Sequence, residues 1–134
     1  MSSITFTTTI TIDRPIADVF ARVADPTGFP DWNSAVESVQ PVGRGRYVMR
    51  RRLPSGPAVN DLEVVERQAP TAFTVRTTSG PTPFVYRYAF APAGDGTVVT
   101  LRGEVEVPAW AALAKHAVRR GVDANLAALR AILG

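Results

Sequence analysis

The stretch PFVYRYAFAPAGDGTVVTLRGEVEV, residues 83–107, decides how the chain folds. Large apolar side chains recur at every second position of 84–90, and in 97–107 apolar residues alternate with mostly polar ones, which is the period of a strand with one buried face. The sequence Gly94-Asp95-Gly96 joins the halves and is typical of a tight hairpin turn. We therefore predict two antiparallel strands, over 83–91 and 97–107.

The same alternation predicts which side chains face the core. The inward set is mostly large and apolar: Phe84, Tyr86, Tyr88, Phe90, Val99, Leu101, Gly103, Val105 and Val107. The charged residues of the pair then face solvent: Arg87, Arg102, Glu104 and Glu106.

Upstream of this hairpin, strand-like segments follow one another at short intervals. We predict strands near 4–12, 35–42, 46–54, 58–67 and 72–79. Turns rich in Gly and Pro separate the later ones and leave no room for crossover helices, so the sheet is expected to be antiparallel. Apolar residues at helical spacing predict a short helix over 15–24, and residues 29–32 predict a second short helix or turn.

Downstream of the hairpin, residues 109–133 contain no proline and many alanines, with apolar residues on one broad face. We predict a helix of roughly 24 residues, about 36 Å long, which would reach across the whole sheet. Small residues recur along it: Ala114, Ala117, Gly121, Ala124 and Ala128. They either let the sheet approach closely or leave volume for a ligand, and the sequence does not separate these two readings.

Residues 10–32, ITIDRPIADVFARVADPTGFPDW, resemble the opening of the START-like superfamily, also called SRPBCC, which includes polyketide cyclases and dehydratases. The turn over 94–97 and the helix after the last strand resemble it too. The resemblance covers essentially the whole chain, taken as one domain over 1–134. It implies an α+β helix-grip fold: a seven-stranded curved antiparallel sheet, two short helices after strand 1, and a long C-terminal helix across the concave face. An apolar cavity is then expected between sheet and helix.

Small-ligand sites are commonly apolar with a few placed polar groups. The predicted ligand-binding residues are Trp32, Arg51, Asn60, Thr77, Phe84, Tyr86, Tyr88, Leu101 and Trp110. Both tryptophans are expected near an entrance. Structural alternatives stay open: the tyrosines and tryptophans as packing residues, and Arg51 as a surface arginine with a packed stem. A bulge in 46–54 or 58–67 would turn Arg51 or Asn60 outward.

We expect the protein to bind a small hydrophobic ligand, lipid-like or aromatic and polyketide-like. The alternative is a polyketide aromatase, cyclase or dehydratase, which would need acid–base groups aimed into the cavity. Only Arg51, Tyr86 and Tyr88 qualify, and we assign no catalytic residue. A protein-interaction module is a further alternative, for which the sequence shows no docking surface.

The rest of the sequence narrows the function by exclusion. Cysteine is absent and His116 is the only histidine, so we expect no disulfide, no metal site and no cofactor. His116 stands beside Lys115 and Arg119 and is expected to be a solvated surface residue. Asp61 and Glu63 are assigned to the outer face of the sheet, in ion pairs with neighbouring arginines.

Partners and location follow from charge and hydropathy. A net charge of +3 without a basic stripe argues against nucleic acid. The N-terminus lacks signal-peptide features, and no apolar stretch approaches the roughly 20 residues that span a bilayer. We expect a cytoplasmic protein without a membrane span. The exposed edges of the sheet would allow a homodimer.

Overall fold

The computed structural model describes residues 2–134. In chain order the elements are β1 (Ser2–Ile12), α1 (Ile16–Val23), the 3₁₀-helix η1 (Pro26–Asp31), β2 (Val36–Gly43), β3 (Arg46–Leu53), β4 (Gly56–Gln68), β5 (Ala72–Thr77), β6 (Phe84–Ala93), β7 (Gly96–Val107), the 3₁₀-helix η2 (Ala109–Ala114) and α2 (Lys115–Leu133). The predicted strands and both short helices after the first strand are confirmed.

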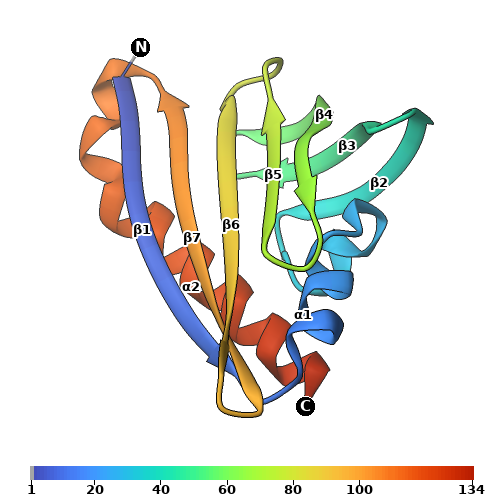
Figure 1. Ribbon diagram of the computed structural model, residues 1–134. Coiled ribbons are helices and arrows are strands. Elements are labelled where there is room, and N and C mark those ends of the chain that lie inside the picture. Colours follow the sequence, from blue (N-terminus) through green and yellow to red (C-terminus); the bar gives the residue numbers. More distant parts are fainter. Residues whose placement is uncertain (1) are drawn as a thin grey trace.

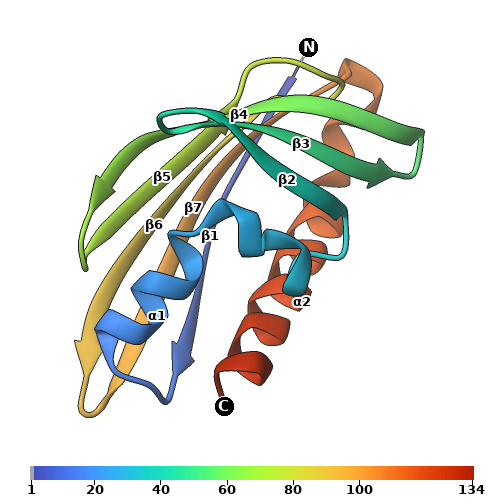
Figure 2. The same cartoon turned by 90° about the vertical axis from the view of Figure 1, so that its right-hand side faces the viewer.

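The strands form one antiparallel sheet in the order β1-β7-β6-β5-β4-β3-β2. The first strand pairs with the last, from Ser2 opposite Val107 to Ile12 opposite Thr97. The sheet is curved, and α2 crosses its concave side (Figures 1 and 2). This arrangement is the helix-grip fold.

Strand parity holds through the centre of the sheet. Phe84, Tyr88, Phe90 and Leu101 are buried, whereas Arg87 is exposed and pairs with Glu104 at 3.4 Å. Bulges occur in β2 and between Val64 and Glu66, but the β3–β4 register runs without a shift. Arg51 and Asn60 therefore keep their predicted inward orientation.

The long C-terminal helix departs from the prediction. The expected helix of roughly 24 residues is divided into η2 and a 19-residue α2, which is about 28 Å long. A 3₁₀-helix has three residues per turn, so positions three apart share a face. In η2, Ala111 and Ala114 pack on the core, whereas Trp110 and Leu113 are 86% and 95% exposed.

The helices α1 and η1 close the remaining side of the core. Phe20 of α1 meets Phe90 of β6 edge-on, with ring centroids 5.2 Å apart. The end of α2 is tied to the same region, because Arg14 Nη1 donates to the carbonyl oxygen of Leu133 at 3.0 Å. In the part of the chain that the structure describes, no helix combines the length and the hydropathy needed to cross a membrane.

Candidate functional site

A cavity of about 340 Å³ lies between the concave face of the sheet and α2. Its wall comes from η1 and the segment after it (Phe29, Trp32, Asn33, Ala35, Val36), from the sheet and its loops (Met49, Arg51, Leu53, Pro54, Val75, Thr82, Phe84, Tyr86, Tyr88, Val105, Val107) and from α2 (Ala117, Val118, Gly121, Val122, Asn125). Most of these side chains are apolar, and a few polar groups stand among them.

Among the described residues, Arg51 is the one charged member of this wall, and only 8% of it is exposed. Its Nε donates to Asn60 Oδ1 at 2.9 Å, and its Nη2 donates to the carbonyl oxygen of Thr82 at 3.4 Å. The guanidinium carbon lies 5.5 Å from the ring centroid of Phe84. Burial lowers the pKa of Arg51, against a smaller opposing effect of Tyr86, yet a guanidinium stays charged at neutral pH.

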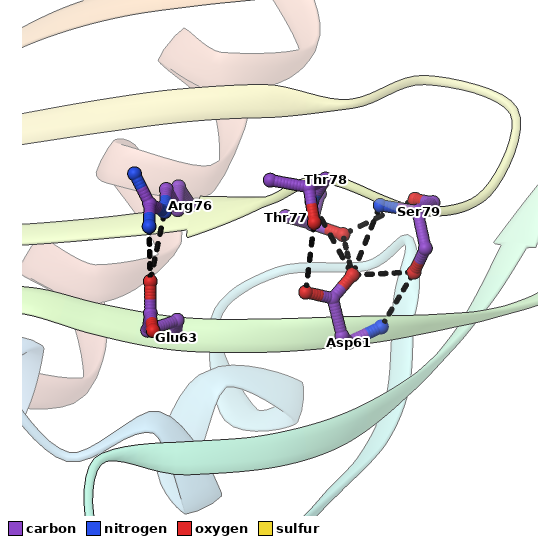
Figure 3. A network of polar contacts seen from close by, with 6 residues as sticks. All are labelled: Asp61, Glu63, Arg76, Thr77, Thr78 and Ser79. Carbon is purple, nitrogen blue, oxygen red and sulfur yellow. Dashed lines mark hydrogen bonds and ion pairs between the residues drawn. The ribbon is translucent and has the colours of Figure 1, made fainter.

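The loop after β5 positions these partners, and Asp61 holds that loop (Figure 3). Asp61 Oδ1 accepts from the backbone N–H of Ser79 at 2.9 Å and from Thr77 Oγ1 at 3.1 Å. It also accepts from the backbone N–H of Thr78 and from the Ser79 hydroxyl. In turn, Asn60 Nδ2 donates to the Ser79 carbonyl oxygen. The loop is thus coupled to Arg51 through Asn60.

The two acidic residues of β4 have different roles. Glu63 pairs with Arg76 at 2.7 Å on the outer face, as predicted (Figure 3). The ion pair predicted for Asp61 is wrong, because the loop brings hydroxyl and amide donors to its carboxylate instead. Burial would raise the pKa of Asp61, but the hydrogen bonds from Ser79, Thr77 and Thr78 outweigh it and lower the pKa to about 2.

Tyr86 and Tyr88 project from β6 into the cavity. Tyr86 stacks on Phe84 with centroids 4.5 Å apart, and Tyr88 meets the Trp32 ring edge-on at 6.5 Å. Burial raises the pKa of Tyr86 to about 12, with Arg51 opposing, and it also raises the pKa of Tyr88. Both hydroxyls are protonated at neutral pH, and within residues 2–134 neither has a hydrogen-bond partner.

Trp32 follows η1 and is 4% exposed. Its ring packs edge-on against Phe29, with centroids 5.5 Å apart. The indole Nε1 is buried and has no hydrogen-bond partner among the described residues. A buried donor of this kind normally has a partner, so this unpaired N–H is an exception among the buried polar groups.

The structure places five of the nine predicted ligand-binding residues on the cavity wall: Trp32, Arg51, Phe84, Tyr86 and Tyr88. Asn60 and Thr77 lie behind the wall, where Asn60 holds Arg51 and Thr77 donates to Asp61. Leu101 is a core residue, 1% exposed. Trp110, expected near an entrance, is exposed on η2 and does not line the cavity, because the 3₁₀ turn directs it outward. A ligand-binding role for these residues remains a prediction.

Three polar residues of the wall escaped the sequence-based prediction: Asn33, Thr82 and Asn125. A signal for Asn125 was present, since it follows Ala117 and Gly121 at intervals of four, on one face of α2. Ala117 and Gly121 line the cavity, and a Cβ added to Gly121 would meet nothing within 4 Å. The small residues of the helix were expected either to let the sheet approach closely or to leave volume for a ligand. Ala117 and Gly121 support the second alternative.

The wall limits the chemistry that this cavity supports. Among the described residues, its lining contains no His, Lys, Asp, Glu or Cys. His116 is exposed on α2 and is not part of the lining, in agreement with its predicted surface position. Proton transfer in the cavity would therefore depend on tyrosine hydroxyls and Arg51, none of which is poised near neutral pH.

Comparison with known proteins gives a family for this sequence. The family described as polyketide cyclase / dehydrase and lipid transport matches residues 3–134. No match was found among curated proteins.

Solved structures share the fold at low sequence identity. A START superfamily protein from Mycobacterium smegmatis is 16% identical with a TM-score of 0.83, over 95% of this chain and 94% of that one. A protein of Thermus thermophilus is 20% identical with a TM-score of 0.77, over 94% of each chain. The di-domain ARO/CYC StfQ from the steffimycin biosynthetic pathway is 12% identical with a TM-score of 0.76, over 96% of this chain and 50% of its own. At these identities the likeness establishes the fold alone.

Proposed function

The chain belongs to the polyketide cyclase / dehydrase and lipid transport family, and from this premise we propose that it binds a small hydrophobic molecule, lipid-like or aromatic, between its sheet and α2. The observation that carries the proposal is the cavity of about 340 Å³. Ligand pockets commonly enclose about 300–1,000 Å³ and combine apolar walls with a few polar groups. This cavity has that size and that composition.

The proposed contacts are the residues that line the cavity and were also expected from the sequence. Phe84, Tyr86 and Trp32 would supply aromatic surface, since aromatic side chains bury large areas in fixed orientations. Arg51 and the tyrosine hydroxyls would supply the polar contacts. Gly121 lies on the wall and is exposed, so it marks a place where the cavity approaches solvent.

The proposal is tested by titrating the protein with neutral hydrophobic probes, 2-naphthalenemethanol and 1-decanol, in isothermal calorimetry. We expect saturable binding of one molecule per chain. A Gly121→Leu variant extends a side chain into the cavity and should weaken binding by about tenfold or more. An Ala127→Leu variant adds the same side chain to an exposed position of α2 outside the cavity and should leave binding unchanged.

Two results would contradict the proposal. One is the absence of saturable binding for both probes and of any co-purified molecule in native mass spectrometry. The other is equal binding by wild type and Gly121→Leu, which would put the probe elsewhere.

A polyketide aromatase or cyclase is the second candidate. It is favoured by Arg51, Tyr86 and Tyr88 on one cavity wall, because neutral phenols and a guanidinium can donate to ketone oxygens while a chain folds. An intramolecular aldol addition followed by loss of water needs no oxidant. Incubation with a tenfold excess of a synthetic poly-β-ketone thioester decides this: a cyclase forms more than one equivalent of aromatic product per chain, and a carrier does not.

A further inference from the structure

We propose that the ligand of this cavity carries a carboxylate on its apolar body, and that Arg51 pairs with this carboxylate. The inference rests on the proposed function, because it specifies the chemistry of the molecule that the cavity takes. It is carried by the partners of Arg51 and by the hydrogen-bonding state of the other polar groups on the wall.

Arg51 is a buried cation that has no anionic partner within residues 2–134. Six other arginines form ion pairs with carboxylates among the described residues: Arg14, Arg22, Arg52, Arg76, Arg87 and Arg119. Arg51 instead has an amide oxygen, a backbone carbonyl and an aromatic ring, all neutral. A buried charge is costly unless it is paired, so a ligand anion would complete this site.

The guanidinium also has donors to spare. An arginine side chain has five N–H donors. Two of these are used within residues 2–134, one from Nε to Asn60 and one from Nη2 to Thr82, which leaves three on Nη1 and Nη2. The end of the fork that carries Nη1 and Nη2 matches the two oxygens of a carboxylate.

The amide side chains of the wall have their oxygens engaged by the protein. Asn33 Oδ1 accepts from the backbone N–H of Ala35 at 3.0 Å, and Asn125 Oδ1 accepts from that of Ser34 at 3.4 Å. Behind the wall, Asn60 Oδ1 accepts from Arg51. The side-chain amide N–H groups of the two wall residues, Asn33 and Asn125, donate to no described residue and remain available as donors.

The aromatic polar groups extend the same pattern. The hydroxyls of Tyr86 and Tyr88, which line the cavity, are protonated and unbonded in the described structure. Among residues 2–134, no carboxylate lines the cavity. A ligand carboxylate would find several donors and no repelling charge, whereas a ligand cation would face Arg51 with no counter-charge.

The test compares three probes that share one ring and differ in their polar group: 2-naphthoate, 2-naphthalenemethanol and 2-naphthylmethylammonium. Calorimetry at pH 7.5 and low salt measures the dissociation constant of each. We expect 2-naphthoate to bind at least about tenfold more tightly than the alcohol, and the ammonium to bind most weakly.

Variants then assign the preference to one side chain. Arg51→Gln should bring 2-naphthoate to within about twofold of the alcohol, because it keeps a donor for Asn60 and removes the charge. Arg50→Gln is the matched control: it changes the preceding residue, which is exposed, and it should keep the preference. Arg51→Lys keeps the charge without the fork and should retain only part of the preference.

Failure of this inference is distinct from failure of the proposed function. If the alcohol binds and 2-naphthoate binds no more tightly, the cavity is a ligand site but the carboxylate is wrong. A preference that survives in Arg51→Gln likewise overturns the role of Arg51. If none of the three probes binds, both proposals fall. The wild-type comparison of polar groups decides the ligand class even if Arg51→Gln does not fold.

Discussion

Gly80 leaves room for Asn60, the side chain that accepts a hydrogen bond from Arg51. Its φ is +83°, and a Cβ there would lie 2.8 Å from Asn60 Cγ. Gly80→Ala should therefore strain the loop and push Asn60 from its place, with a cost of about 1–3 kcal/mol in the free energy of unfolding. Urea denaturation measures this cost.

Gly94→Ala is the matched control for that change. Gly94 also has a positive φ, +61°, but an added Cβ meets nothing within 4 Å. The Gly94→Ala variant therefore measures the loss in free energy of unfolding that backbone strain alone causes. Any additional loss in Gly80→Ala reports the collision with Asn60. If both variants lose the same free energy of unfolding, the Asn60 side chain moves aside without a measurable loss of stability and does not position Arg51.

Asp61 gives the site a specific dependence on acid. Its folded pKa of about 2 lies below its ordinary value of 3.8, so the ionised form is favoured by folding. Its contribution is fully present above about pH 5 and is lost as the pH falls through 4 toward 2. Because this carboxylate is partly exposed and solvent screens it, we expect the contribution to be about 1 kcal/mol or less. The wild-type advantage over Asp61→Asn in urea denaturation should shrink across that window. An advantage that stays constant from pH 6 to pH 3 would contradict this assignment.

For single residues, the sequence predicts the face of the sheet on which a side chain lies better than it predicts the hydrogen-bond partners of that side chain. Parity places Arg51 inward because its strand alternates and contains no bulge. Parity says nothing about the loop over 78–83, which supplies the carbonyl partners of Arg51 and Asn60 and the donors of Asp61. The error over Asp61 arose there, since a strand pattern does not show which loop folds over its end.

Among the elements, η2 and η1 place the two tryptophans in opposite environments. Trp110 is 86% exposed on η2, and Trp32 is 4% exposed after η1. Trp110→Ala should change the free energy of unfolding by less than about 0.5 kcal/mol, whereas Trp32→Ala should cost about 3–5 kcal/mol. Each variant keeps the other tryptophan as a fluorescent reporter of urea unfolding. A loss above about 2 kcal/mol for Trp110→Ala would mean that η2 packs its tryptophan against the core.

The break between η2 and α2 explains why helical periodicity overestimated the apolar face. Trp110 and Leu113 fit an α-helical stripe with Ala117 in the sequence. In a 3₁₀ turn, however, residues three apart share a face, and here Ala111 and Ala114 take the inward positions. Element type was predictable at this end of the chain, but the local pitch, which decides side-chain direction, was not.

For the whole molecule, the fold was predictable because alternation, turn residues and the closing helix all agree. The cavity was predictable only as a place. Its volume is the space that the curved sheet and α2 enclose, less the volume of the side chains that fill it. Small residues such as Ala117 and Gly121 are compatible either with close packing of the helix on the sheet or with empty space. Sheet curvature depends on twist and bulges, which the hydrophobic pattern does not specify.

The charge pattern of the complete cavity predicts how binding responds to pH. Arg51 stays charged, the pKa of Tyr86 is about 12, that of Tyr88 is raised too, and no other titratable side chain lines the cavity among residues 2–134. A carboxylate probe is ionised throughout the same range. The affinity for 2-naphthoate should therefore be constant between pH 6 and pH 9 in calorimetric titrations.

The single histidine provides the sharpest check on this expectation. His116 is exposed and outside the cavity lining, so His116→Gln should reproduce the flat profile of the wild type. A step in affinity within this pH range that disappears in His116→Gln would connect the surface of α2 to the site. A step that persists in that variant would require a titrating group that this cavity does not contain. If the affinity for 2-naphthoate is constant with pH in both wild type and His116→Gln, the cavity recognises a fixed charge and contains no group that transfers a proton near neutral pH. This result would favour the carrier over the cyclase.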